Sequence, residues 1–407
     1  MARRRPHPES LGITLLLTAL TALGQFSTGM YLPSMPSLAA TLQTTPDMVN
    51  LTLSIFFASF AVAQLVYGPL SDRFGRRSTL LGGLVVYFAA SVACTLAPTI
   101  ETLIAARFLQ ALGACAGPVL GRAVIRDVYG RERSTKVLAT ISLVFAVSPG
   151  VIPIVGGYLE EWFGWRSVFL TLSLLAAAVF VAAWWLLDET NRRPDRDAAR
   201  PGTVLRTYAR LLGNAEFLGY ALAVALVFGG LMAYVAAAPF LFIETLGLAP
   251  RHFGWIGVIN GVGFLAGTLT AGRWSMALGI ERTVLAGVLV AAVGGIAMTV
   301  VAATSGISLV AIIAPMILFL AGMALVFPAG TAGAMGPFPQ AAGAASALMG
   351  FFQMAIAAVT STTVGYLPHA TQLPMAVVVL IVSVAAVVAF VTLAWRRPAA
   401  APADAPR

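Results

Sequence analysis

The sequence has little charge, little cysteine and little histidine. Charged residues make up only 10% of its 407 residues and hydrophobic residues 59%, whereas a soluble domain carries about 25% charged residues. The composition therefore indicates an integral membrane protein. The three histidines lie in the N-terminal tail or at the ends of apolar runs, and the two cysteines, Cys94 and Cys115, lie inside apolar runs without metal-ligand residues nearby. The side chains that build most catalytic and metal sites are missing, so we expect no enzyme activity, no cofactor and no metal.

Lysine is almost absent as well. The formal net charge is +9, and every basic residue except Lys136 is an arginine. The arginines form short clusters between apolar runs rather than one stripe, which argues against a nucleic-acid partner. If both termini are cytoplasmic, 20 of the 25 basic residues fall in cytoplasmic segments, and only Arg166 and Arg251 lie at external ends. We therefore expect a multi-pass protein of the bacterial inner (plasma) membrane with both termini in the cytoplasm.

Apolar runs long enough to cross a bilayer occur twelve times. They cover 11–32, 49–69, 78–97, 100–121, 137–159, 166–187, 215–238, 253–273, 283–303, 307–328, 341–363 and 372–395. The one long polar segment divides them six and six, and its later part has the spacing of a helix that lies along the membrane surface. The sequence predicts an all-α membrane protein with an N-terminal six-helix bundle (1–187), a cytoplasmic linker (188–213), a C-terminal six-helix bundle (214–396) and a disordered cytoplasmic tail (397–407).

The loop after the second span is short, polar and rich in arginine. It reads Gly68-Pro69-Leu70-Ser71-Asp72-Arg73-Phe74-Gly75-Arg76-Arg77. Irregular backbone cannot face lipid, so the loop lies in water, and its three arginines place it on the cytoplasmic side. A degenerate copy follows the eighth span, with Gly272, Arg273, Gly279, Glu281 and Arg282 but no acid matching Asp72. Repeated bundles of this kind enclose a central site at mid-membrane.

The fourth span contains a charged residue. Arg107 and Gln110 lie three residues apart and share one helix face. By count, Arg107 lies about 10 Å from the external end of its helix, where a charge is costly and almost never faces lipid. Either neighbouring carbonyls satisfy it as a structural arginine, or it faces a wet central cavity, and we favour the second reading. Arg122 and Arg126 lie near the cytoplasmic end, where long side chains can reach the interface.

The fifth span contains an unusual run of small and helix-breaking residues: Pro149, Gly150, Pro153, Gly156 and Gly157. In a membrane bundle such residues allow a bend and a close approach of two backbones. A Gly263-x-x-x-Gly267 pattern in the eighth span matches it. Together the two patterns predict a seam between the bundles.

These segments resemble a known family. The stretches that carry the resemblance are GPLSDRFGRR, LIAARFLQALGACAG, GRAVIRDVYG, SPGVIPIVGGYL, FGWRSVF and APFLFIE. They are similar to the 12-span drug:proton antiporter branch of the major facilitator superfamily, and within it to the Bcr/CflA group of bacterial multidrug efflux proteins. The resemblance implies two pseudo-symmetric six-helix bundles and alternating-access export of small hydrophobic drugs, such as chloramphenicol or bicyclomycin, in exchange for protons.

The resemblance also implies roles for particular residues. It implies a cytoplasmic gating motif made of Gly68, Asp72, Arg73, Gly75, Arg76, Arg77 and Arg126, with Arg126 as the partner of Asp72. It implies that Arg107, Gln110 and Arg122 belong to the proton or substrate pathway. The proline and glycine run of the fifth span then corresponds to the antiporter seam.

One departure from the family affects coupling. Its members usually carry an acid before Met-Tyr-Leu-Pro in the first span, whereas this chain has Gly29 there, and none of its 16 acids lies near the middle of a span. Either a peripheral carboxylate such as Glu244 substitutes, or water and Arg107 suffice, or coupling is weak or lost. An uncoupled facilitator, or a metabolite importer or exporter on the same fold, is therefore the alternative function.

The residues expected to line a central cavity are aromatic, amide or thioether side chains: Gln25, Phe26, Met30, Tyr31, Phe57, Gln64, Tyr234, Asn260, Phe264, Phe351, Phe352 and Gln353. Such a lining suits an apolar or weakly polar organic molecule. Because no acid lies at mid-depth, it favours neutral or anionic substrates over lipophilic cations. We expect the protein to act on them as a monomer in the lipid bilayer.

Overall fold

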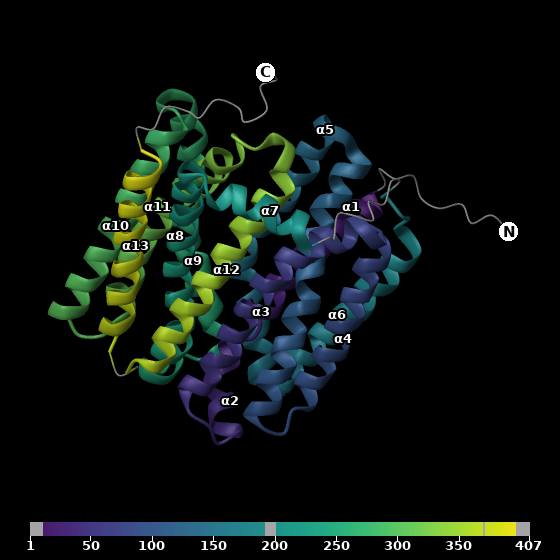
Figure 1. The fold of residues 1–407 in the computed structure, drawn as a ribbon. Coiled ribbons are helices and arrows are strands. Elements are labelled where there is room, and N and C mark those ends of the chain that lie inside the picture. The colour runs from purple at the N-terminus through teal and green to yellow at the C-terminus, as the bar shows by residue number, and fades with distance from the viewer. Residues whose placement is uncertain (1–10, 192–200, 369–370, 396–407) are drawn as a thin grey trace.

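The computed structural model describes residues 11–191, 201–368 and 371–395, and within them the side chains of 130–147 and of a few single residues, Pro149 among them, are excluded. The described residues are almost entirely helical and contain no strand (Figure 1). The long helices are α1 (Leu11–Gly29), α3 (Pro46–Phe74), α4 (Arg76–Leu96), α5 (Ile100–Phe163), α6 (Trp165–Leu186), α8 (Ala215–Pro239), α9 (Pro250–Leu278), α10 (Ile280–Thr304), α11 (Leu309–Met335), α12 (Ala342–Tyr366) and α13 (Leu373–Leu393). Short helices connect some of them: η1 (Leu32–Ser34), α2 (Met35–Thr41), α7 (Pro201–Leu212), η2 (Phe240–Thr245) and η3 (Pro339–Ala341). The predicted tail and residues 192–200 of the predicted linker lie outside the described residues.

Helix α5 contains both the fourth and the fifth predicted spans, which the sequence analysis placed in separate helices. Three hydrogen bonds to α1 trace its path: Arg107 with Ser27, Tyr129 with Thr14, and Ser148 with Gln25. Residues 25 and 27 lie near the end of α1 and residue 14 near its start, so α5 reverses direction between Tyr129 and Ser148. Its two arms therefore cross the same layer in opposite directions, as two spans would.

The described residues contain eleven stretches that are long and apolar enough to cross a membrane. With the second arm of α5, they account for the twelve predicted runs. Many large apolar side chains point outward from these helices; Leu174, Leu269 and Val310, for example, are each more than half exposed. Such a surface is too apolar for water and fits the hydrocarbon of a bilayer.

The helices pack in two groups, one made of α1 and α3–α6 and the other of α8–α13. The groups meet where α3 packs along α12 and where α5 packs along α9 (Figure 1). We call the end that contains the Gly75 turn, the Gly279 turn and α7 the basic end, which is uppermost in Figure 1. The end that contains α2 and the Gly164 turn is the opposite end.

The predicted internal repeat is visible in two turns of the backbone. Gly75 joins α3 to α4 with φ 95° and ψ 151°, and Gly279 joins α9 to α10 with φ 86° and ψ 164°. This region of backbone space is essentially open only to glycine. The two halves therefore reverse direction through the same strained turn at matching places, although the second copy lacks the acid of the first.

Candidate functional site

A cluster of charged side chains surrounds the Gly75 turn at the basic end. Arg76 is buried and lies between two carboxylates: its Nη2 is 2.5 Å from Asp72 Oδ1, and its Nε is 3.3 Å from Asp127 Oδ2. The same guanidinium donates to the Ser71 hydroxyl. Asp72 lies at the end of α3 and Asp127 on α5, so one arginine at the start of α4 holds three helices together.

The predicted pairing of Asp72 with Arg126 is wrong. The structure pairs Asp72 with Arg76, because the reversal at Gly75 brings the first residue of α4 back against the last turn of α3. Arg126 is exposed. Arg73 is also exposed, with its guanidinium 5.0 Å from the centre of the Phe74 ring, and a Cβ on Gly68 would contact nothing within 4 Å.

Two residues that the sequence analysis missed complete this cluster. Glu189 accepts hydrogen bonds from the backbone N–H groups of Arg76 and Arg77, at 2.9 and 3.1 Å. A carboxylate there satisfies unpaired donors at the start of α4 and interacts favourably with the helix dipole. Asn191 donates to the carbonyl of Asp72 at 2.9 Å. The available signal was a pair of acidic residues, Asp188 and Glu189, directly after the sixth span.

Arg77 binds the end of α6. Its Nε donates to the carbonyl of Leu187 at 2.8 Å, its Nη2 donates to the carbonyl of Trp184 at 3.0 Å, and its guanidinium lies 5.0 Å from the centre of the Trp184 ring. The predicted gating motif therefore contacts α5, α6 and the segment after α6, all within the N-terminal group of helices.

Arg107 is completely buried within the N-terminal group of helices. Its guanidinium lies 4.4 Å from the ring centre of Phe56, 4.9 Å from that of Tyr31 and 5.8 Å from that of Phe169. Its Nη1 donates to the Ser27 carbonyl at 3.0 Å and to Gln110 Oε1 at 2.6 Å. Cation–π contacts and these two hydrogen bonds offset part of the cost of burying the charge, whereas Nε and Nη2 are buried without a hydrogen-bond partner among the described residues. This differs from the prediction that Arg107 faces a wet cavity.

Gln110 extends the network around Arg107, and Arg122 lies apart from it. The Gln110 side chain is buried and donates to the Ser91 hydroxyl at 2.9 Å. Arg122 is exposed and donates to the carbonyl of Pro118, one turn earlier in α5. The three predicted pathway residues therefore do not form one site in this conformation.

The seam between the two groups of helices is built from glycines on both sides. A Cβ on Gly150 would come within 2.8 Å of Val258, and a Cβ on Gly157 would overlap the carbonyl of Pro250, both on α9. From the α9 side, a Cβ on Gly254 would overlap the backbone nitrogen of Ile154. Gly254 was not among the residues that the sequence analysis predicted for this seam.

The remaining residues of the two predicted patterns pack elsewhere. A Cβ on Gly156 would overlap the carbonyl of Met30, and Pro153 lies within 3.8 Å of a Cβ built on Gly29, so this face of α5 packs against α1 and the segment after it. Gly263 and Gly267 approach α11 inside the C-terminal group, not the seam as expected. A helix has several faces, and each of these glycines lies on a face other than the one at the seam.

Charged residues join the groups at the opposite end. Arg251 Nη1 lies 2.5 Å from Glu161 Oε1, and this ion pair connects the start of α9 to the end of α5. The neighbouring Glu160 is buried and accepts a hydrogen bond from the Ser37 hydroxyl of α2 at 2.5 Å. Together with the glycine contacts, these interactions close the opposite end in this structure.

The predicted cavity residues fall into several places. Tyr31 lies two residues after the end of α1, and its ring packs against the Arg107 guanidinium, with its hydroxyl 2.7 Å from that of Thr52. Met30 and Phe57 are also buried, and Gln64 packs directly against Gly350 of α12. Tyr234 and Asn260 come together: the Asn260 amide donates to the tyrosine hydroxyl at 2.8 Å.

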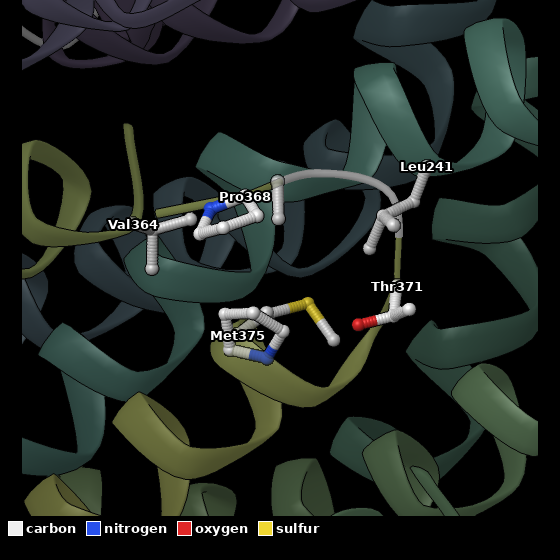
Figure 2. A pocket seen from close by; sticks show the side chains of 7 residues that line it. Leu241, Val364, Pro368, Thr371 and Met375 are labelled. Carbon is white, nitrogen blue, oxygen red and sulfur yellow. The ribbon is translucent and has the colours of Figure 1, made fainter. Parts of the chain in front are cut away.

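The other cavity candidates keep part of their surface exposed: Gln25, Phe26, Phe264, Phe351, Phe352 and Gln353. The rings of Phe351 and Phe352 meet edge to face, 5.8 Å apart. A separate small hollow lies between the ends of α8, α12 and α13 and is lined by residues such as Leu241, Pro368 and Met375 (Figure 2). It contains none of the predicted site residues.

Position 29 is crowded for the missing acid. A Cβ on Gly29 would approach Ile152 to 2.9 Å, because α1 and α5 are in close contact there. Glu244, the peripheral carboxylate considered as a substitute, is exposed near the end of η2.

Comparison with known proteins identifies the family. The Major Facilitator Superfamily model matches residues 17–362. The uncharacterized MFS-type transporter YdgK of Bacillus subtilis is 31% identical over 391 residues, covering 96% of this chain and 97% of the relative. The bicyclomycin resistance protein homolog of Haemophilus influenzae is 29% identical and covers 89% of this chain and 90% of its own length. Among solved structures, a partially occluded inward open conformation of the xylose transporter XylE from E. coli is similar in fold, with a TM-score of 0.74 at 15% identity and coverage of 95% of this chain and 97% of that one. The predicted family resemblance is thus confirmed: this chain belongs to the Major Facilitator Superfamily and is a membrane transporter rather than an enzyme.

Proposed function

We propose that this protein exports small hydrophobic molecules from the cytoplasm across the bacterial inner (plasma) membrane by alternating access. The observation that supports this most is the closure of the opposite end, where glycines bring α5 and α9 into backbone contact and Arg251 pairs with Glu161. A separate charged cluster around Arg76 lies at the basic end. The bundles thus touch through glycines and an ion pair at the opposite end, while the charged cluster at the basic end stays within the N-terminal bundle, and this asymmetry suits a transporter that opens its sides in turn.

The arginine distribution places the basic end in the cytoplasm. The relative named for bicyclomycin resistance, aligned over most of its length, supports export of a drug-like molecule. We propose that the bundles 1–187 and 214–396 move as units joined by the linker 188–213, and that a single chain forms the transporter.

For the substrate, we propose neutral or anionic organic molecules. The Tyr234–Asn260 pair offers hydrogen-bonding groups in an otherwise apolar setting, which is how selective drug pockets orient a ligand. Among the described residues, Glu160 is the one acid with a buried side chain, and it lies at the opposite end rather than at mid-depth. A lipophilic cation would therefore find no counter-charge at the centre.

Proton exchange is the form of coupling that the resemblance implies. We propose that Arg107 and Gln110 act on it indirectly, by fixing α1, α3 and α6 around α5, and that Arg122 is the exposed member of the pathway. One observation favours a second function, an uncoupled facilitator: the place of the usual acid is Gly29, with Ile152 pressed against it.

Everted membrane vesicles loaded with a pH-sensitive dye test both functions. With an inward-acidic gradient, addition of chloramphenicol should dissipate the gradient, and ethidium should have little effect. Transport of labelled chloramphenicol without proton movement would instead favour the facilitator. Asp72→Asn serves as the gate variant, since it should reduce transport while the protein still inserts into the membrane. Full transport activity of Asp72→Asn would show that the charged cluster is not part of the gate.

A further inference from the structure

A proline interrupts the hydrogen bonding of α3 just before the gating motif. Pro69 lies inside α3, near its end at Phe74. Proline has no N–H, so it cannot donate to the carbonyl four residues earlier, and its ring also crowds that carbonyl. The carbonyl of Leu65 therefore lacks the donor that a helix normally supplies.

A side chain of the linker helix replaces that donor. The hydroxyl of Tyr208, on α7, donates to the Leu65 carbonyl at 3.2 Å. The tyrosine is half-buried, and burial raises its pKa, so the hydroxyl keeps its proton. The contact is partly buried, and a main-chain carbonyl that is shielded from water without a partner is costly.

The linker helix is attached to the other bundle. Asn214, two residues after α7, caps the start of α8: its Oδ1 accepts from the N–H of Phe217 at 2.8 Å. α7 also packs against α8 and α12, with Leu211 buried in that contact (Figure 1). A displacement of the C-terminal bundle therefore displaces Tyr208.

The part of α3 after the proline is attached to the N-terminal bundle. Asp72 pairs with Arg76, and Asn191 donates to the Asp72 carbonyl. The part before the proline also packs against the N-terminal bundle, where Phe56 contacts Arg107, but in addition it lies along α12, with Gln64 directly against Gly350. Pro69 thus separates the part of α3 that meets the C-terminal bundle from the part that carries the gating motif, and this is where a proline permits bending.

We propose that Tyr208 is a positioning residue of the transport cycle. Its hydroxyl holds α7 to the carbonyl that Pro69 leaves free in the state closed at the opposite end, and the contact is released when the bundles rock to the other state. Through it, movement of the C-terminal bundle reaches the joint of α3 next to the gating motif. This role rests on the alternating access proposed above.

The test measures the equilibrium between the two states without any drug. Spin labels are placed on cysteines at Thr45 and Ser305, which are exposed at the opposite end on different bundles, after Cys94 and Cys115 are replaced by alanine. Pulsed electron paramagnetic resonance in lipid nanodiscs then gives the ratio of short (closed) to long (open) distances. Losing one hydrogen bond in Tyr208→Phe should lower this ratio about fivefold.

A second background isolates the role of the proline. In Pro69→Ala, the new N–H can bond the Leu65 carbonyl, so adding Tyr208→Phe there should change the ratio less than twofold. Tyr129→Phe is the matched control, because its hydroxyl bonds Thr14 within the N-terminal bundle, and the ratio should stay unchanged.

The outcomes separate the two proposals. An equal effect of Tyr208→Phe in both backgrounds, no effect in either, or an equal effect of Tyr129→Phe would overturn the role of Tyr208. One fixed distance in every variant would instead refute the rocking of the bundles, and with it the alternating access on which the role depends.

Discussion

The substitution Gly254→Ala tests whether glycine contacts close the opposite end. Gly254 faces α5, and a Cβ there would overlap the backbone nitrogen of Ile154 and its Cγ1. The side-chain atom can move but the backbone nitrogen cannot, so α5 and α9 must separate. Overpacking of this kind costs about 1–3 kcal/mol. The cost falls only on the closed state, so the equilibrium should shift toward the open state by about 5- to 150-fold.

Gly261→Ala on the same helix is the matched control. A Cβ at Gly261 would meet nothing within 4 Å. Both substitutions gain the same helix propensity of about 1 kcal/mol, so their difference isolates the contact with α5. Gly261→Ala should therefore leave the equilibrium within about twofold of the parent.

Cysteine accessibility measures this equilibrium. Ser54 of α3 is buried, and its hydroxyl lies 2.9 Å from that of Ser361 across the boundary between the bundles. A cysteine at Ser54 should react with a membrane-impermeant maleimide only when the opposite end opens, so its labelling rate reports the open fraction. Equal labelling rates in Gly254→Ala and Gly261→Ala would refute the reasoning that close backbone contact holds this end shut.

Three further substitutions test the ion pair at the opposite end, the carboxylate at the start of α4 and the space at position 29. Arg251→Ala should raise the same labelling rate less than about fivefold, because its ion pair with Glu161 is partly exposed and worth at most about 1 kcal/mol; the exchanged pair, with glutamate at 251 and arginine at 161, should restore the rate. Glu189→Gln removes the charge at the start of α4 and should lower the free energy of unfolding by about 0.5 kcal/mol. This is measured as a slightly lower thermal unfolding midpoint, and the labelling rate should not change. Gly29→Asp should reduce the yield of folded protein, and Ile152→Ala in the same chain should restore the yield by making room; recovery without it would show that position 29 tolerates an acid.

The sequence predicts those features that follow from local composition. Apolar length gives the spans, and arginine clusters give their ends. The pattern of glycines and charges after the second and eighth spans predicts the repeat, and Gly75 and Gly279 reverse the chain there with similar dihedral angles. The depth of Arg107 is also readable, because it is only a count along a helix. All of these features can be predicted without knowing which helices are neighbours in the fold.

Contacts between distant segments could not be read in this way. Glu189 lies more than a hundred residues after the backbone N–H groups that it binds, and Gly254 a hundred residues after Ile154. Their pairing depends on which face of each helix meets its neighbour, and spacing within one helix does not settle that. Tyr31 was misplaced for a related reason: its ring packs against Arg107 and Phe169, which lie far from it in the sequence.

The location of the acids constrains any coupling mechanism. A carrier carboxylate must face both sides in turn, so it is expected near mid-depth between the bundles. The usual place holds Gly29, which carries no acid and is crowded by Ile152, and the buried acid among the described residues, Glu160, is hydrogen-bonded to Ser37 at the opposite end. A proton bound there would return to the side from which it came when that end opens. Exchange with protons therefore requires a group other than an acid at position 29, and the described acids such as Glu244 lie toward the helix ends rather than at mid-depth. Loss of proton movement with retained drug movement in Glu244→Gln would assign the coupling to that peripheral carboxylate, and unchanged proton movement would exclude it.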